Sequence, residues 1–289
     1  ERDVYTRRVF EDHLLKTDTY RRIQPDEAAL ILTTLKMKVG QFTNSFSNIL
    51  PTNEKEYLLR SIKQHRKIPS FYLTMKIHKT PMATRPIVAI RGSITAGLGT
   101  WLDQQLQPIC KKLPTYLKSS FELTDLLKDL PDLPDGARLF TADAVSMYTN
   151  IDTDHALSVI RRYLPLTPHN KAIMTALDII MKHNFFQFGN TNWLQLTGTA
   201  MGTPPAPMYA TLYFEILEKD TMLRCDDAIG SSPRSLTVLP MGKMPACTPA
   251  RGIGIARPSA VIQQVIGALK PSKLVTGKRT ISWAEIVGR

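Results

Sequence analysis

The sequence predicts an α+β fold. Stretches of alternating apolar and polar residues, typical of strands, lie between longer stretches with helical periodicity. The chain has 289 residues, which is enough for one or two domains with a sizeable core, and it has no internal repeat.

Periodicity also predicts the order of the elements. A strand hairpin is expected at 72–88, a single strand should end at Asp143, and a second hairpin is expected at 185–196. Each predicted helix has an apolar face, formed by residues at 3.6-residue spacing. The helices are expected at 22–50, 54–65, 98–113, 120–130, 154–164, 170–182 and 205–217.

Asp143 is the only acid in the segment Ala137 to Ile151, and it ends a strand that is otherwise apolar or neutral. A buried carboxylate is costly unless it is paired, and the nearest cation in sequence, Arg138, is five residues away. Either a divalent metal pairs with Asp143, with Tyr148 beside it as the floor of a nucleotide site, or Asp143 caps the next helix and Tyr148 belongs to the core.

A dense run of small residues follows the second hairpin. Residues 197–207 read TGTAMGTPPAP and lead directly into an apolar helical pattern. Glycine and small residues before a helix allow a backbone or a flat ligand to approach closely, and a helix N-terminus favours anions. The alternative is a tight connection that binds no ligand.

Four blocks together resemble reverse transcriptases, most closely those of Penelope-like retroelements. They are Phe71-Tyr-Leu-Thr-Met-Lys-Ile-His-Lys79, Arg85-Pro-Ile-Val88, Asp143-Ala-Val-Ser-Met-Tyr-Thr-Asn-Ile151, and Gln195-Leu-Thr-Gly-Thr-Ala-Met-Gly202 with Ala206-Pro-Met-Tyr-Ala210. The resemblance covers roughly residues 55 to 220 and implies a polymerase right-hand fold with fingers and palm. The thumb is expected to be absent or replaced by the C-terminal tail.

The resemblance also implies a role for each matching residue near the metals. Asp143 would bind two catalytic Mg²⁺ ions, or Mn²⁺, and the backbone carbonyl of Ala144 would complete one metal shell. Tyr148 would lie under the incoming sugar and exclude a ribose 2′-hydroxyl. The site would therefore prefer deoxynucleotides.

Further residues would bind the nucleotide itself. Met201 and Gly202 would flank its base and sugar. Lys76 or Lys79, together with Arg85, would hold the triphosphate, because Arg contacts phosphate through two hydrogen bonds and Lys supplies a mobile charge. For Lys79 alone, a solvated surface charge is the simpler interpretation.

The third palm motif of the family is missing or displaced. That motif is a hairpin with two adjacent aspartates that follow an aromatic and one variable residue, and here the only downstream pair is Asp226-Asp227, with no aromatic two positions before it. Asp226 and Asp227 are the candidates for the remaining catalytic acids, with Asp226 as a metal ligand. The alternative is that the chain departs from the family near Lys219.

Composition changes after residue 230. The segment 231–289 has nine Lys or Arg and one acid, so it carries +8 of the net charge of +12. Its prolines, glycines and single aromatic, Trp283, predict a tail of low order with one short helix at 260–270. The expected organisation is an N-terminal helical region at 1–54, fingers and palm at 55–228, and a basic tail at 229–289.

Charge and cysteine usage limit the classes of function. The basic net charge favours a polyanionic partner. The three cysteines are too far apart for a zinc site or a disulfide framework, and no apolar run is long enough to cross a bilayer. We therefore expect an intracellular protein, nuclear or cytoplasmic, that has no membrane partner.

The sequence thus predicts an RNA-directed DNA polymerase domain of a retroelement, as a truncated or degenerate copy. Its partners would be an RNA template, a DNA primer and deoxynucleoside triphosphates. Two alternatives stay open: a catalytically inactive remnant that binds nucleic acid, and a reverse transcriptase of the intron-maturase type.

Overall fold

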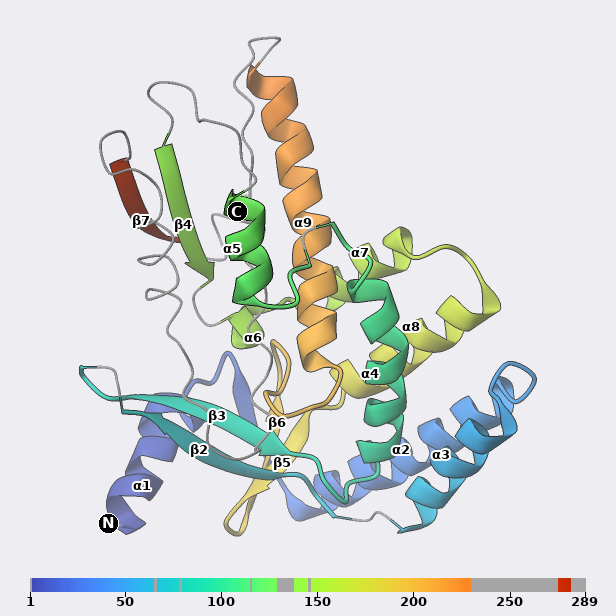
Figure 1. Cartoon of the computed structure of the whole chain (residues 1–289). Helices are drawn as coiled ribbons and strands as arrows, with labels where there is room; N and C mark the ends of the chain where they lie inside the picture. The colour runs from blue at the N-terminus through green and yellow to red at the C-terminus, as the bar shows by residue number, and fades with distance from the viewer. Residues whose placement is uncertain are drawn as a thin grey trace. The chain divides into compact units, whose positions relative to one another are not determined.

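The computed structural model describes residues 2–64, 67–77, 80–114, 116–128, 138–144, 147–229 and 275–281. It is an α+β structure, as the sequence predicts (Figure 1). By its internal contacts the chain divides into two compact units: one contains residues 1–109 and 146–216, and the other contains 110–145 and 217–289. The predicted division into helical region, fingers with palm, and tail stays a prediction.

A five-stranded sheet forms the centre of the first unit. Its strands are β1 (Tyr20–Ile23), β2 (Ser70–Lys76), β3 (Ala83–Ala89), β5 (Phe185–Phe188) and β6 (Thr191–Gln195), arranged in the order β1-β6-β5-β2-β3. Both predicted hairpins are present, because β2 pairs antiparallel with β3, and β5 with β6. The two hairpins join through a parallel contact between β2 and β5.

One face of this sheet carries an aromatic core. Phe71 and Phe186 stack with their ring centroids 4.8 Å apart, and Tyr20 and Trp193 belong to the same buried cluster. Helix α1 (Arg2–Val9) and a short π-helical turn, η1 (Phe10–Leu14), contribute Val9 and Leu14 to it. The N-terminal segment is therefore part of the core, which the sequence did not indicate.

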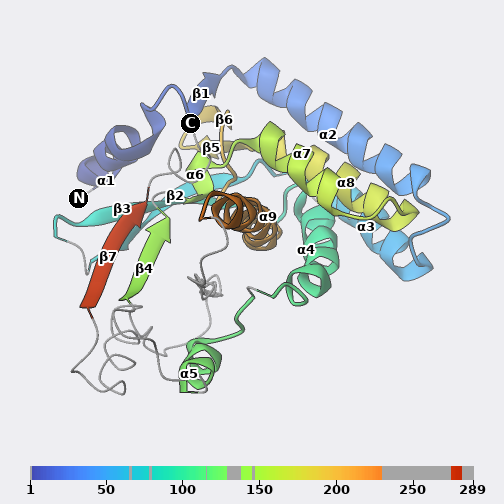
Figure 2. The same cartoon turned by 90° about the horizontal axis from the view of Figure 1, so that it is seen from above.

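Helices complete the first unit (Figure 2). They are α2 (Pro25–Ser45), α3 (Thr52–Gln64), α4 (Ala96–Cys110), α6 (Met147–Asn150), α7 (Thr153–Tyr163), α8 (Pro168–Met181) and the start of α9 (Ala206–Ile229). Helix α2 packs against both α3 and α8, and α8 also packs against α7. The indole of Trp101 in α4 donates a hydrogen bond of 2.6 Å to Glu54 of α3.

The structure corrects several predicted helix boundaries: the helix expected at 22–50 ends at Ser45, and the helix expected at 98–113 ends at Cys110. The helix expected from residue 22 begins at Pro25, because proline is suited to the first helical turn and Tyr20–Ile23 instead pairs with β6. The helix expected to end near residue 217 continues to Ile229. Nothing in its sequence before that point breaks a helix, since no proline or glycine occurs between Met208 and Ile229.

The second unit contains helix α5 (Ser120–Lys128) and a two-stranded parallel sheet. Strand β4 (Arg138–Ala144) pairs with β7 (Val275–Ile281), and Asp143 lies opposite Thr280. The strand at Asp143 is confirmed, whereas the strand within the basic tail was not predicted. The short helix predicted at 260–270 lies outside the described residues.

Candidate functional site

A loop of small residues, 196–205, connects β6 to α9 and is fixed at both sides by backbone hydrogen bonds. On one side, the N–H of Thr199 donates to the carbonyl of Tyr148 at 2.7 Å, and the N–H of Gly198 donates to Ile151 at 2.9 Å. On the other side, the N–H of Val88 in β3 donates to the carbonyl of Met201 at 2.7 Å. The loop therefore joins α6 to the edge of β3, two segments that are far apart in sequence.

Two glycines make this close approach feasible. Gly198 has φ +76°, and a Cβ there would lie 2.4 Å from the carbonyl oxygen of Tyr148. Gly202 has φ +106°, and a Cβ there would lie 2.5 Å from the carbonyl oxygen of Val88 and 3.3 Å from the side chain of Ile87. Side chains are excluded at both positions by backbone conformation and by space.

The hairpin β2–β3 presents its basic residues on the face away from the aromatic core. Thr74 lies directly opposite Arg85, and Lys76 lies opposite Ala83, so all four share one face. Arg85 is exposed and Lys76 is half-buried, whereas Phe71, Leu73, Pro86 and Val88 alternate with them and are buried. Ile87, which touches the loop at Gly202, lies on the same face as Arg85.

Tyr148 is half-buried in α6 and lies within electrostatic range of Arg85. Burial raises the pKa of the Tyr148 hydroxyl, and the positive charge of Arg85 partly offsets that rise because it favours the phenolate. The phenol is therefore neutral at physiological pH and can act as an apolar surface with a hydrogen-bonding tip.

Tyr148, Arg85, Met201 and Gly202 thus come together, although they belong to three separate blocks of the sequence. We refer to this arrangement as the Arg85–Tyr148 corner: Arg85, Tyr148 and the loop 198–202. It combines a cation, an aromatic ring and exposed glycine backbone at Gly202. This combination suits a flat ligand that carries negative charge.

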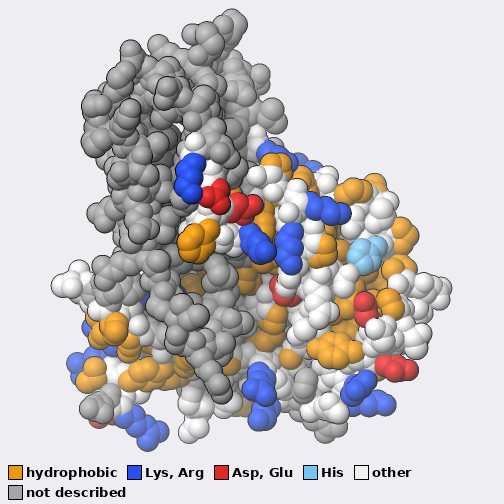
Figure 3. Space-filling model, viewed as in Figure 1, with side chains coloured by type: hydrophobic (Ala, Val, Ile, Leu, Met, Phe, Trp, Pro, Cys, Tyr) orange, Lys and Arg blue, Asp and Glu red, His pale blue; other side chains and the backbone are white. Residues whose placement is uncertain are grey.

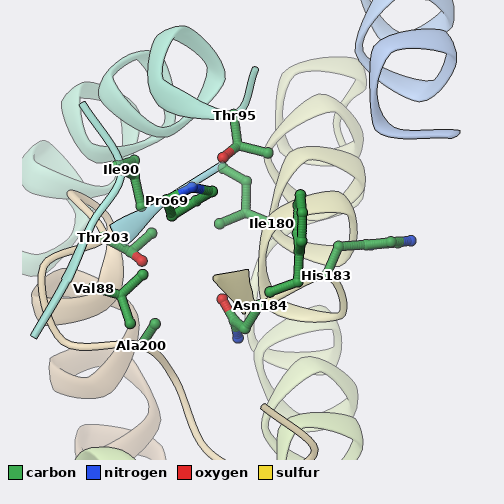
Figure 4. Close-up of a pocket in the computed structure, with 10 residues that line it drawn as sticks. Pro69, Val88, Ile90, Thr95, Ile180, His183, Asn184, Ala200 and Thr203 are labelled. Atoms are coloured by element: carbon green, nitrogen blue, oxygen red, sulfur yellow. The ribbon is translucent and has the colours of Figure 1, made fainter. Parts of the chain in front are cut away.

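A cavity of about 20 Å³ lies behind the loop and is not the ligand site (Figure 4). Val88, Ala200 and Thr203 line one side of it, Ile180 and Asn184 line the other, and the ring of His183 points away. This volume holds about one water molecule, whereas pockets for organic ligands measure about 300 Å³ or more. A nucleotide at the corner would therefore bind outside this cavity.

The other candidate residues, apart from Lys76, belong to the second unit or lie outside the described residues. Asp143 and Ala144 are the last two residues of β4, in the second unit. Asp226 and Asp227 lie within helix α9, not on the hairpin that the resemblance implies for the third palm motif. Lys79 lies outside the described residues.

The metal site predicted at Asp143 and Asp226 stays a prediction, because the structure does not describe the side chains of these residues. Within the described ranges, no three or more His, Cys, Asp or Glu side chains are grouped so that they could hold a metal ion. Within those ranges, too, no helix combines the length and the apolar composition needed to cross a bilayer.

No family model and no curated protein matches this chain. The functional interpretation of the Arg85–Tyr148 corner therefore depends on its geometry and on the sequence motifs that meet there.

Sequence reasoning missed one polar network on the core side of β3. The Thr84 hydroxyl donates to Asp12 at 2.7 Å and lies 2.9 Å from Nε2 of His13. Because the Thr84 proton points to Asp12, Nε2 of His13 is the donor to Thr84. Burial is the main cause that lowers the pKa of His13 to about 4. No local signal in the sequence indicates this network, since its partners are more than 70 residues apart.

Proposed function

We propose that this chain is a reverse-transcriptase-like domain of a retroelement, with the polymerase right-hand fold, and that its Arg85–Tyr148 corner binds a deoxynucleoside triphosphate. One observation carries the proposal: three motif blocks that resemble the nucleotide-binding segments of that family meet at one place in the fold. Arg85 acts electrostatically on Tyr148, and the loop 198–202 contacts the backbone of both α6 and β3.

Each residue of the corner has a separate task in this proposal. The guanidinium of Arg85 holds phosphate oxygens through two parallel hydrogen bonds, and Lys76 adds charge on the same face of the hairpin. The Tyr148 ring supports the sugar. Gly202 is exposed, so that the base and sugar can approach its backbone, and Met201 lies next to it in the loop.

Nucleotide titration tests this assignment. We expect dATP to bind the wild-type protein, and we expect Arg85→Gln to weaken binding at least about tenfold because the charge-assisted phosphate contact is lost. Arg60→Gln, which removes an exposed arginine of α3, is the matched control and should leave the affinity unchanged. Equal affinities in all three proteins would refute the role of Arg85.

The sugar preference offers a second measurement on the same protein. If Tyr148 excludes a ribose 2′-hydroxyl, Tyr148→Ala should bring the affinities for ATP and dATP close together while the protein stays folded. A Tyr148→Ala protein that keeps its preference for dATP would place Tyr148 in the core only.

A second candidate function is a nucleic-acid-binding domain that no longer performs nucleotide transfer. The observation that favours it is helix α9, which continues through Asp226 and Asp227. Successive positions on a helix face directions about 100° apart, so a helix does not present two adjacent acids to one pair of ions as a hairpin tip does. The helical position of Asp226 and Asp227 therefore favours this second candidate.

Primer extension distinguishes the two candidates. On an RNA template with a DNA primer, we expect negligible Mg²⁺-dependent extension, because activation of the primer hydroxyl requires a second ion close to the first. Extension that disappears in both Asp143→Asn and Asp226→Asn would contradict this and would make Asp226 and Asp227 a displaced but working motif.

A further inference from the structure

Helices α2 and α3 form an open groove that the proposed nucleotide site does not use. Its volume is about 590 Å³. The lining residues come from both helices and include Thr33, Lys36, Met37 and Gly40 of α2 and Leu59, Ile62 and Lys63 of α3. On the face that Figure 3 shows, hydrophobic, basic and acidic side chains lie next to one another in the region that α3 occupies in Figure 1.

Large apolar side chains are exposed along this groove. Met37 is 56% exposed and Leu59 is 36% exposed, and Leu30, two turns before Met37 on α2, is 66% exposed. Leu30, Thr33, Met37 and Gly40 follow one another at spacings of three and four, which places them on one stripe of α2. Contiguous apolar surface of this kind marks an interaction site more often than isolated exposed residues do.

Gly40 indicates that the partner approaches the backbone of α2. It lies in the interior of the helix, where glycine destabilises the structure relative to alanine. No heavy atom lies within 4 Å of a Cβ built at this position, and its φ is not in the left-handed region. No neighbour in the described part of the chain therefore explains why position 40 carries no side chain. A partner that packs closely into the groove would explain it.

The charged residues that line the groove indicate which charge a partner should carry. Lys36 and Lys63 are both exposed, and no acid is among the described residues that line the groove. Met37, Leu59 and Ile62 are the apolar residues of the lining, which also includes Gly40. A nucleic acid binds mainly through its phosphates, and the apolar residues of the groove offer no cation to them. A helix with one apolar face and acidic flanks would complement both the apolar residues and the two lysines.

We propose that the α2–α3 groove binds an acidic amphipathic helix of a partner protein. The apolar side chains of that helix, at positions i, i+3 or i+4, and i+7, fill the space between Met37 and Leu59. Its backbone passes over Gly40, and its carboxylates reach Lys36 and Lys63. This interaction surface goes beyond nucleotide binding and does not depend on it.

Two synthetic peptides of about 18 residues test the proposal. Both carry leucines on one face of a helix, and the other positions are rich in glutamate in the acidic peptide and in lysine in the basic peptide. Fluorescence anisotropy with the full chain should show binding of the acidic peptide and at least about tenfold weaker binding of the basic one. Equal binding of both peptides, or of neither, would overturn the proposal.

Variants of the groove locate the binding. In Gly40→Gln the added Cβ meets no neighbouring atom and glutamine favours the helix, so the protein should be at least as stable in urea, yet acidic-peptide binding should fall about tenfold or more. The double variant Lys36→Glu and Lys63→Glu should reverse the preference between the two peptides. Lys171→Glu, at an exposed lysine of α8, is the matched control and should change neither result.

Other occupants of the groove would produce different results. Concentration-dependent self-association in sedimentation, removed by Gly40→Gln, would assign the groove to a second copy of this chain and overturn the proposal. Displacement of the acidic peptide by a single-stranded RNA, again dependent on Lys36 and Lys63, would assign it to nucleic acid and overturn the proposal equally.

Discussion

Residues of the Arg85–Tyr148 corner stand in motifs that resemble reverse transcriptases, and the resemblance implied that Arg85, Tyr148, Met201 and Gly202 lie near one nucleotide. The structure brings these four residues together, while their role in nucleotide binding stays a prediction. Gly198 was noticed only as part of a run of small residues, because its contact with Tyr148 depends on tertiary structure. The network of His13 left no signal at all, since ordinary polar residues form it across the fold.

At Gly202, substitution by alanine should destabilise the protein. The added Cβ meets the Val88 carbonyl, and φ is +106°, so we expect Gly202→Ala to lower the free energy of unfolding by about 3 kcal/mol. Gly189→Ala is the control: φ is +56° there but nothing lies within 4 Å, so the cost should be about 1 kcal/mol. Urea unfolding measures both, and equal losses would show that the close contact at Gly202 has no energetic effect.

His13 should make stability depend on pH. Its pKa in the folded protein is about 4, below its ordinary value of 6.5, so between these values the unfolded chain binds more protons. This contribution to stability is complete above pH 6.5 and is lost as pH falls towards 4.

Urea unfolding at several pH values between 7 and 4 measures this loss. His13→Gln keeps a donor for Thr84 without titrating and should flatten the pH dependence. Part of the dependence should remain, because burial also lowers the pKa of His183. An unchanged slope in His13→Gln would exclude His13 as a source.

Elements with clear boundary signals were predicted well. Helices α7 and α8 begin at capped positions: the Asp152 side chain accepts from the N–H of His155 at 3.0 Å, and Thr167 accepts from Asn170 at 3.1 Å. Strand β1 was missed because its pairing with β6 joins residues far apart in sequence. The end of α9 was predicted too early, and the helix continues because no breaker lies between Leu217 and Ile229.

The N-terminal cap of α7 should contribute to the stability of the protein. Asp152→Ala removes an acceptor for one of the free N–H groups at the start of the helix and should cost about 1 kcal/mol of stability. Asp152→Asn keeps a side-chain oxygen at the same place and should cost much less. Thermal unfolding compares the two, and equal losses would mean that the cap bond is not what stabilises the helix start.

For the whole molecule, composition predicted a basic chain, but it did not predict that part of the C-terminal segment forms a strand. Strand β7 comes from the basic tail and pairs along the whole length of β4, which ends with Asp143 and Ala144. The strand is hard to predict because it has only seven residues, Val275–Ile281, within a segment rich in proline and glycine. Long-range parallel pairing has no local signature.

The basic tail should contribute to nucleic-acid binding. Affinity for single-stranded RNA should fall with salt, with a log-log slope of about −0.7 for each phosphate neutralised. Replacing tail cations outside β7, such as Arg251, Arg257 and Lys270, by glutamine should reduce that slope without removing the partner of β4. The control replaces Arg161, Arg162 and Lys171 by glutamine. The same slope in both variants would show no special role for the tail.

A double-mutant cycle on dATP affinity tests whether separate blocks of the sequence form one nucleotide site. The four proteins are the wild type, Arg85→Gln, Tyr148→Ala and the double variant. We predict that each single variant weakens binding and that the double variant weakens it less than the two effects combined, with a coupling of about 1 kcal/mol. Single effects that add within about 0.3 kcal/mol, or that are both absent, would contradict a single shared site.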